Sequence, residues 1–225
     1  ITTIVTNDNV IVARKQDGTL VAWLGDAWQS ISSSSVSGVV SMFPAGTGVA
    51  SLKADGTAHL LAPNSSISAI SLAEGIPPGE KIVTFYTTRL FYVYVTDGGY
   101  GGTNYDGGYN QNNLNSIEAV YTTEGAAAIK RSNHIVNVIG GPEYGGSCGT
   151  VCQLLQDSTT VIDSIYTTHA AFAAVTTDGS LLAWGNSEYG GDATSVSAYI
   201  NATSGGSNSI VAMTSNYGAF SCLLH

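Results

Sequence analysis

The side chains that could carry acid–base, nucleophilic or metal chemistry are few in this sequence and widely spaced. Neither a phosphate-binding glycine loop nor a pair of histidines around a glutamate on a helix is present. We therefore expect no catalytic residues, no metal site and no cofactor, and a protein that is not an enzyme. The histidines stand at positions 59, 134, 169 and 225, and the glutamates at 74, 80, 118, 124, 143 and 188.

The most distinctive polar segment is rich in glycine, tyrosine and asparagine and runs from Gly98 to Asn113. Tyrosine rings stack on sugars, and amide and carboxylate groups hydrogen-bond to sugar hydroxyls. Carboxylate and amide oxygens also suit Ca²⁺, but the spacing matches no EF-hand loop. A long loop packed on its own sheet or on a neighbouring subunit is the alternative. We expect the segment to replace a third strand and to contact a ligand or partner through Tyr100, Asn104, Tyr105, Asp106, Tyr109 and Asn110.

The cysteines and the glycosylation sequons bear on the compartment in which the protein works. Cys148 and Cys152 lie four apart in a glycine-rich loop, where the backbone can curl enough for a local disulfide. Cys222 lies in an alternating strand pattern and is expected to be a buried thiol. Asn64 and Asn201 begin Asn-x-Ser/Thr sequons. With the low lysine content, these features favour an extracellular or cell-surface glycoprotein.

The net charge of the chain limits the classes of macromolecule that it can bind. Seven Lys and Arg against 16 Asp and Glu give a net charge of −9 at pH 7. Sequence-independent nucleic-acid binding and attraction to anionic membranes both need a basic surface, so we expect neither. The best apolar run, Leu90–Val95, is far shorter than the roughly 20 residues of a membrane-spanning helix, so we expect no membrane insertion.

An internal repeat organises the whole chain. Units start near residues 1, 39, 82, 117, 162 and 210, with a mean period of about 42 residues. A turn former stands at the same distance from the first strand in five units, at Asp17, Asp55, Gly98, Asn133 and Asp178. Asp-Gly between two apolar runs predicts a hairpin with a type I′ turn, whose two central residues both have positive φ.

Each unit is too small to bury its own apolar face, so neighbouring units must stack. The period, about three short strands per unit and the lack of a helical stripe predict an all-β fold. We expect a β-propeller of about six short blades, five full repeats and a C-terminal half repeat, forming a single domain over residues 1–225. Trp23 and Trp184 should lie between blades. The edge strand Ala219–Leu224 should pair with a strand from outside its half repeat.

A Tyr-Thr-Thr sequence recurs where the first strand of a unit ends, with the tyrosines at 86, 121 and 166. Threonine hydroxyls at such a corner can bond to backbone groups, which favours a structural role. The alternative is a ring of identical contact points on one face of the protein.

The run from Phe172 to Asn186, FAAVTTDGSLLAWGN, and its continuation Ser187–Asp192 resemble a repeat of the regulator of chromosome condensation family. The likeness is greatest to the short-repeat members found in secreted and marine microbial proteins. It implies a propeller. It does not imply one activity, because the family includes exchange factors, inhibitors and scaffolds.

These patterns predict a non-enzymatic extracellular propeller that presents its surface to another macromolecule. The partner would be another protein or a second copy of the chain. A carbohydrate-binding lectin is the first alternative, and a secreted protein inhibitor of an enzyme is the second.

Overall fold

The computed structural model describes residues 1–7, 10–24, 27–31, 36–45, 48–62, 68–71, 76–105, 112–201 and 209–225. The chain forms two compact units, Ile1–Asn115 (unit 1) and Ser116–His225 (unit 2). The single domain expected over residues 1–225 stays a prediction. Among the described residues, no helix has the length and apolar character needed to cross a membrane.

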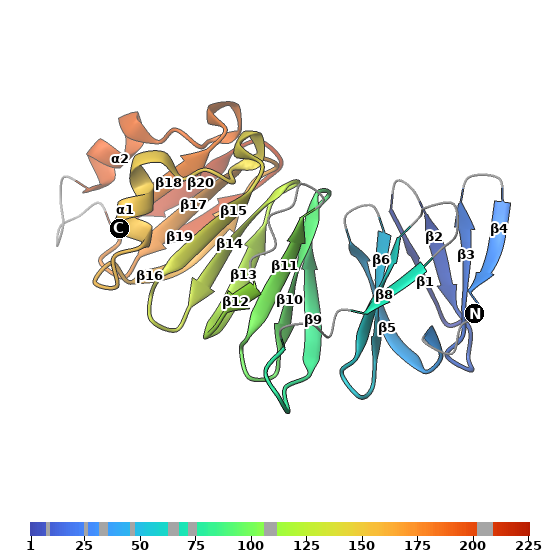
Figure 1. Ribbon diagram of the computed structural model, residues 1–225. Helices are drawn as coiled ribbons and strands as arrows, with labels where there is room; N and C mark the ends of the chain where they lie inside the picture. Colours follow the sequence, from blue (N-terminus) through green and yellow to red (C-terminus); the bar gives the residue numbers. More distant parts are fainter. Residues whose placement is uncertain are drawn as a thin grey trace. The chain divides into compact units, whose positions relative to one another are not determined.

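Unit 1 contains three antiparallel sheets, each with four strands in chain order (Figure 1). The first sheet is β1 (Thr3–Thr6), β2 (Ile11–Arg14), β3 (Leu20–Leu24) and β4 (Ala27–Ile31); the second is β5 (Val39–Ala45), β6 (Gly48–Lys53), β7 (Ala58–Ala62) and β8 (Ser68–Ser71); the third is β9 (Ile82–Thr87), β10 (Phe91–Thr96), β11 (Gly101–Tyr105) and β12 (Asn112–Leu114).

Unit 2 contains two three-stranded sheets and one two-stranded sheet among its described residues. Short helices follow the third strand of each three-stranded sheet. The sheets are β13 (Ile117–Thr122), β14 (Ala126–Arg131) and β15 (Val136–Gly140); β16 (Ile162–Thr167), β17 (Ala171–Thr176) and β18 (Leu181–Gly185); and β19 (Ile210–Ser215) with β20 (Phe220–Leu224). The helices are η2 (Pro142–Tyr144), η3 (Gly149–Val151), α1 (Cys152–Leu155), η4 (Ser187–Tyr189) and α2 (Thr194–Asn201).

The turns between second and third strands lie where the sequence predicts them, but their type differs from the prediction. The Gly18 N–H donates to the Lys15 carbonyl at 3.0 Å, and the Lys15 N–H donates to the Thr19 carbonyl at 2.8 Å. This closes a three-residue loop in which Gly18 has positive φ and Asp17 does not, so the predicted type I′ turn is wrong. The Thr19 hydroxyl and N–H both donate to the Asp17 carboxylate, and these bonds lower its pKa. These hydrogen bonds to the Asp17 carboxylate favour the three-residue loop over a two-residue type I′ turn.

The glycine-rich segment contributes a third strand to the sheet in its described part, so the expectation that it replaces a third strand is wrong; its residues 106–111 lie outside the described residues. β11 is the third strand and pairs along its length with β10. Gly102 lies opposite Tyr94, and a Cβ on Gly102 would come within 2.5 Å of the Tyr94 hydroxyl oxygen. Glycine at this position therefore makes room for a buried ring. Burial, and then the neighbouring Tyr100, raise the pKa of Tyr94 to about 12.

The apolar core lies between successive sheets of each unit. The alanine-rich strands β14 and β17 are the middle strands of their sheets, and β17 is buried along its whole length. In unit 2, Phe172 stacks on Trp184 with ring centroids 5.2 Å apart, within the core formed with the preceding sheet. Trp184 is buried as predicted, whereas Trp23 is exposed within unit 1, so its predicted place between blades stays a prediction. No described sheet of unit 1 precedes β1 to cover Trp23.

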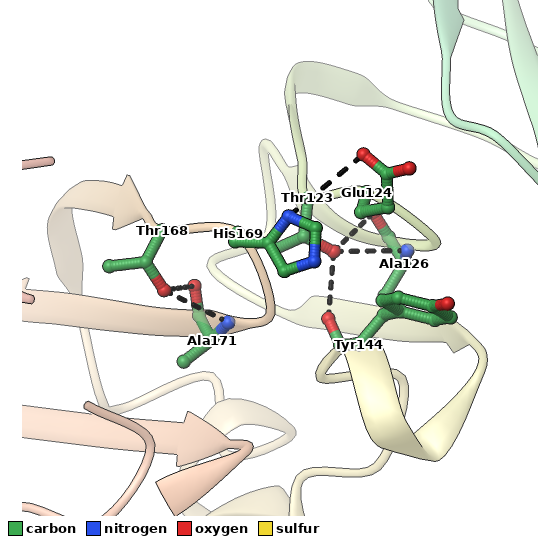
Figure 2. A network of polar contacts seen from close by, with 7 residues as sticks. All are labelled: Thr123, Glu124, Ala126, Tyr144, Thr168, His169 and Ala171. Atoms are coloured by element: carbon green, nitrogen blue, oxygen red, sulfur yellow. Dashed lines mark hydrogen bonds and ion pairs between the residues drawn. The ribbon is translucent and has the colours of Figure 1, made fainter. Parts of the chain in front are cut away.

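A recurring threonine corner joins the first and second strands in the sheets that begin with β9, β13 and β16. The Thr168 hydroxyl accepts a hydrogen bond from the Ala171 N–H at 3.1 Å and lies 2.9 Å from the Tyr189 carbonyl, to which it donates. Thr123 makes the same two bonds, with the Ala126 N–H at 3.0 Å and the Tyr144 carbonyl at 2.7 Å (Figure 2). The second threonine of each Tyr-Thr-Thr is buried, so the predicted structural role is confirmed for these hydroxyls.

The predicted disulfide between Cys148 and Cys152 is present. Cys148 is buried in the cluster that contains Phe172, Trp184 and Leu155. The bond therefore holds η3 and α1 over the stacked rings of the next sheet. Cys222 is only half-buried, less than the sequence pattern predicts, and packs from β20 against β17 and β18.

Loss of the disulfide should destabilise the protein by about 2 kcal/mol, because the reduced loop gains conformational freedom in the unfolded chain. Urea unfolding of a Cys222→Ala background with and without reductant measures this difference. The unreduced native protein should expose one alkylatable thiol, Cys222. Alkylation of Cys148 and Cys152 without reductant would contradict the disulfide.

Replacing Thr168 with valine should lower the free energy of unfolding by about 1–3 kcal/mol, because the Ala171 N–H and the Tyr189 carbonyl both lose a buried partner. The matched control is Thr167→Val, the same substitution one residue earlier at a half-buried side chain. We expect the control to change stability by less than about 0.5 kcal/mol. Equal losses in the two variants, measured by chemical unfolding, would contradict the role of the Thr168 hydroxyl.

Candidate functional site

The residue that follows the corner threonine differs from sheet to sheet while the corner itself is kept. Glu124 follows Thr123 and His169 follows Thr168. In the last sheet Asn216 takes the place of the threonine, and its side-chain oxygen accepts from the Gly218 and Ala219 N–H groups at 3.0 and 2.9 Å. Tyr217 follows it. A fixed backbone thus carries a glutamate, a histidine and a tyrosine at equivalent places.

Backbone hydrogen bonds link these three residues into a row. The Glu124 N–H donates to the His169 carbonyl at 3.0 Å, and the His169 N–H donates to the Tyr217 carbonyl at 2.9 Å. Each bond joins the corner of one sheet to the corner of the next. Because the backbone is fixed in this way, the three side chains emerge at the same end of unit 2.

Two further tyrosines reach this end from the short helices. Tyr144 ends η2 and Tyr189 ends η4, and each backbone carbonyl accepts the corner threonine hydroxyl described above. Two glycines follow each tyrosine. A Cβ on Gly146 would lie 2.2 Å from the Gly140 carbonyl oxygen, so the chain returns too close to β15 for any other residue.

Three tyrosine rings lie near the imidazole ring of His169, and Figure 2 shows this imidazole together with Tyr144 and Glu124. The centroid of the imidazole lies 4.7 Å from that of the Tyr217 ring, on which it stacks, 5.0 Å from that of the Tyr189 ring and 6.1 Å from that of the Tyr144 ring. The Tyr189 and Tyr217 rings meet edge to face at 5.8 Å. His169 Nδ1 lies 4.0 Å from a Glu124 carboxylate oxygen. We call these five residues, Glu124, Tyr144, His169, Tyr189 and Tyr217, the corner patch.

The corner patch is aromatic and acidic. Desolvation by its neighbours raises the pKa of Tyr217, and the hydrogen bond with Tyr189 and the charge of Glu124 raise it further, although the residue as a whole is well exposed. The phenol is therefore neutral at neutral pH. Glu143 and Glu188 are exposed and precede Tyr144 and Tyr189 in the chain. The patch can offer ring faces, phenol hydroxyls and carboxylates to a binding partner, and tyrosine is among the residues enriched in the centres of protein interfaces.

The residues predicted for ligand binding do not lie together on a described surface. Tyr100 is buried in the cluster of Phe85, Tyr92 and Tyr94, so its predicted exposure is wrong. Its ring fills the core beside the glycines of β11. Asn104 and Tyr105 are in β11. Asp106, Tyr109 and Asn110 lie outside the described residues, so a carbohydrate or partner site there stays a prediction.

The two predicted glycosylation sites also stay predictions. Asn64 lies outside the described residues, and Asn201 is the last residue of α2. The described residues contain no group of three or more His, Cys, Asp or Glu side chains placed to hold a metal ion. The corner patch itself was missed by sequence reasoning. Its signal is the recurrence of Glu-Tyr-Gly-Gly at 143–146 and 188–191.

Comparison with known proteins finds likeness in structure only. No protein-family profile matches the chain, and no curated protein matches its sequence. Prp20p from Saccharomyces cerevisiae has a TM-score of 0.50 and 13% identity over 81% of this chain and 56% of that one. Yeast RCC1 (Prp20) bound to Kap60 has a TM-score of 0.50 and 12% identity over 81% and 55%. The ectodomain of the Arabidopsis thaliana receptor kinase ACR4 has a TM-score of 0.48 and 9% identity over 82% and 71%.

The matched region spans little more than half the length of the yeast proteins. At this identity the likeness concerns the fold. The six sheets in chain order and the match to the yeast structures confirm the predicted fold class. The sheets are the blades of an all-β fold like that of the RCC1 propeller.

Proposed function

We propose that this chain is a non-enzymatic protein-interaction module and that the corner patch binds a basic segment of a partner protein. The observation that carries the proposal is the gathering of three tyrosines and a glutamate around His169 on a shared backbone framework. Tyrosine is enriched in the centres of protein interfaces, because its ring buries a large area and its hydroxyl still bonds.

The acidic character of the patch favours a cationic partner. Glu124, Glu143 and Glu188 bring three carboxylates to the same end of unit 2 as the rings, and the five residues of the corner patch include no lysine or arginine. A guanidinium group can lie on a tyrosine face and also hydrogen-bond to a carboxylate. The net charge of −9 draws such a segment toward the protein at a distance.

The structural relatives are in keeping with this kind of role. Prp20p is described by its binding to Gsp1p and histones, and yeast RCC1 was solved bound to Kap60. Those partners belong to those proteins. What supports the proposal here is that a blade framework leaves loops and corners free to differ while the sheets keep their packing.

We also propose that the protein works outside the cell or on its surface, as the secreted short-repeat resemblance implies. The Cys148–Cys152 disulfide supports this, because such bonds persist in oxidising compartments. Alkylation of intact source cells before lysis tests it. Both cysteines should resist alkylation until reductant is added, and ready alkylation of both would count against the location.

Binding to synthetic peptides of matched length tests the partner chemistry. Fluorescence anisotropy should detect an arginine-rich peptide and should detect no binding of its glutamate counterpart. The affinity should fall as salt is added, because the attraction between exposed charges is screened. Tyr217→Ala should weaken binding of the basic peptide by about 5- to 30-fold, since a central tyrosine contributes about 1–2 kcal/mol.

The matched control is Tyr199→Ala, which removes an exposed tyrosine from α2, outside the corner patch. It should leave peptide affinity unchanged. Equal binding of basic and acidic peptides, or equal loss in the two variants, would overturn the proposal. A glycan array run alongside separates the lectin alternative, which requires glycan binding and no preference for basic peptides.

A further inference from the structure

The third strand of the middle sheet of unit 2, β18, has a backbone edge at a place where every sheet of unit 1 has a further strand. In unit 1 a fourth strand pairs antiparallel with each third strand, β4 with β3, β8 with β7 and β12 with β11. Among the described residues of unit 2, β18 is the edge strand of its sheet. The chain that follows it forms η4 and α2 instead of a fourth strand.

The hydrogen-bond pattern of the β17–β18 hairpin shows which backbone groups of β18 reach this edge. The Ser180 carbonyl and the Asn186 N–H each bond across the hairpin, at 3.0 Å. Bonded and non-bonded pairs alternate in an antiparallel ladder, so the even-numbered residues from 180 to 186 bond across the hairpin. The N–H and carbonyl of Ala183 therefore point to the outer edge, where no described residue bonds to them.

A groove of about 500 Å³ follows this edge, and all of its lining residues belong to unit 2. It is lined by β18, by residues 147–151 of the loop that carries the disulfide, and by residues 191–194 with Ser197 at the start of α2. Its volume is in the range of ligand-binding pockets. The lining includes one carboxylate, Asp192, and no lysine or arginine.

The described residues on either side of segment 202–208 lie at the other end of β18. Ile200 on α2 packs in one cluster with Leu181, and the Ile210 N–H donates to the Gly179 carbonyl at 3.3 Å. The chain is thus anchored at the start of β18 both before and after that segment, whereas the groove extends along the strand to Gly185.

A buried hydrogen-bond donor beside the groove lacks an acceptor. Trp184 lines the groove and is 2% exposed, and its indole N–H has no partner among the residues that the structure describes. A buried donor without an acceptor is costly. An occupant with carbonyl or hydroxyl oxygens would bring acceptors to this part of the molecule.

The fourth strands of unit 1 show which chemistry suits such an edge. Their sequences are AWQSI in β4, SAIS in β8 and NNL in β12. None contains a charged residue, and each combines small or amide side chains with one isoleucine or leucine. The repeat places Ala183 at the position of Leu60, whose partner on β8 is Ile70. The pairing of β8 with β7 therefore supplies a register for an occupant of β18.

We propose that an extended, uncharged segment of a partner protein binds in this groove and pairs with β18 as an antiparallel fourth strand. Its backbone exchanges hydrogen bonds with the outward N–H and carbonyl of Ala183, which gives affinity, and its side chains meet the disulfide loop and α2, which gives specificity. The groove shares no residue with the corner patch and takes a segment without charge. The two sites can therefore succeed or fail independently.

Amide hydrogen exchange, measured by NMR on the unmodified chain, tests whether the edge is free. The Ala183 N–H should exchange rapidly because water is its only partner, whereas the Trp184 N–H, which bonds across the hairpin, should exchange slowly. Slow exchange of Ala183 in the free protein would mean that the edge is already paired and would overturn the proposal. Protection of Ala183 that rises with protein concentration alone would assign the edge to a second copy and exclude the partner segment.

The probe for the occupant is a capped peptide with the sequence of residues 66–72, SISAISL, which contains β8. At saturation it should slow exchange of the Ala183 N–H by about tenfold or more and leave that of Trp184 unchanged. A methyl group on the peptide nitrogen at the position of Ile70 removes the N–H that pairs with Ala183, so it should weaken binding by about tenfold.

The matched control peptide carries the same methyl group one residue earlier, at the position of Ala69, where the N–H points away from β18. It should bind within about threefold of the unmodified peptide. Equal losses from the two methyl groups, or a peptide that leaves Ala183 exchange unchanged, would contradict strand pairing. This comparison alters only the peptide, so it does not depend on the folding of any protein variant.

Two protein variants separate this groove from the corner patch. Ala183→Pro removes only an outward N–H, at a kind of position where edge strands accept proline. It should weaken the SISAISL peptide by about tenfold and leave the affinity for the arginine-rich peptide unchanged. Tyr217→Ala should have the reverse effects. A proline variant that binds SISAISL as tightly as the wild type does, or equal losses of both peptides in both variants, would refute a separate strand-pairing site.

Discussion

The structure depends on the packing of bulky residues from one sheet against small residues of the sheet before it. Sheets of two to four short strands cannot bury enough apolar surface alone, so each gains its core from its neighbours. Val12 and Ala22 face Val49 and Leu61 in unit 1, and Ala128 faces Phe172 in unit 2. Small side chains on one face let the sheets approach, and large ones on the other fill the space between them. Turns, corners and surface residues are arranged around this contact.

At the corner, the residue that stabilises the fold and the residue available for binding are different, adjacent positions. Its buried threonine hydroxyl bonds to backbone only, so it holds the chain whatever side chain comes next. The next position is Arg89, Glu124, His169 or Tyr217 in successive sheets. Charge and shape at this position can therefore change without any change in sheet packing. The glycines after Tyr144 and Tyr189 cannot vary in this way, because the returning backbone leaves no room for a side chain.

The sequence predicts the sheet order well because the repeat signals are local. A turn at a constant distance from the first strand needs only Asp17-Gly18 and its equivalents, and a three-residue loop and a type I′ turn share the same residues, so the sequence places the turn without giving its type. The burial of Tyr100 escapes prediction because it depends on which residues lie across from this ring. Gly102 is explained only by the ring of Tyr94 opposite to it. The corner patch also escapes prediction from the sequence, because Tyr144 and Tyr217 are far apart in the chain and are brought together only by their contacts with His169.

The backbone bonds from Glu124 to His169 and from His169 to Tyr217 give the corner row a constant spacing. Each repeat contributes one residue to this row, so its composition is set one repeat at a time. Duplication or loss of a repeat would lengthen or shorten the row by one place and leave the order of the others intact. Binding selectivity can then change through single substitutions in this row, while the threonine corners keep the spacing of its residues.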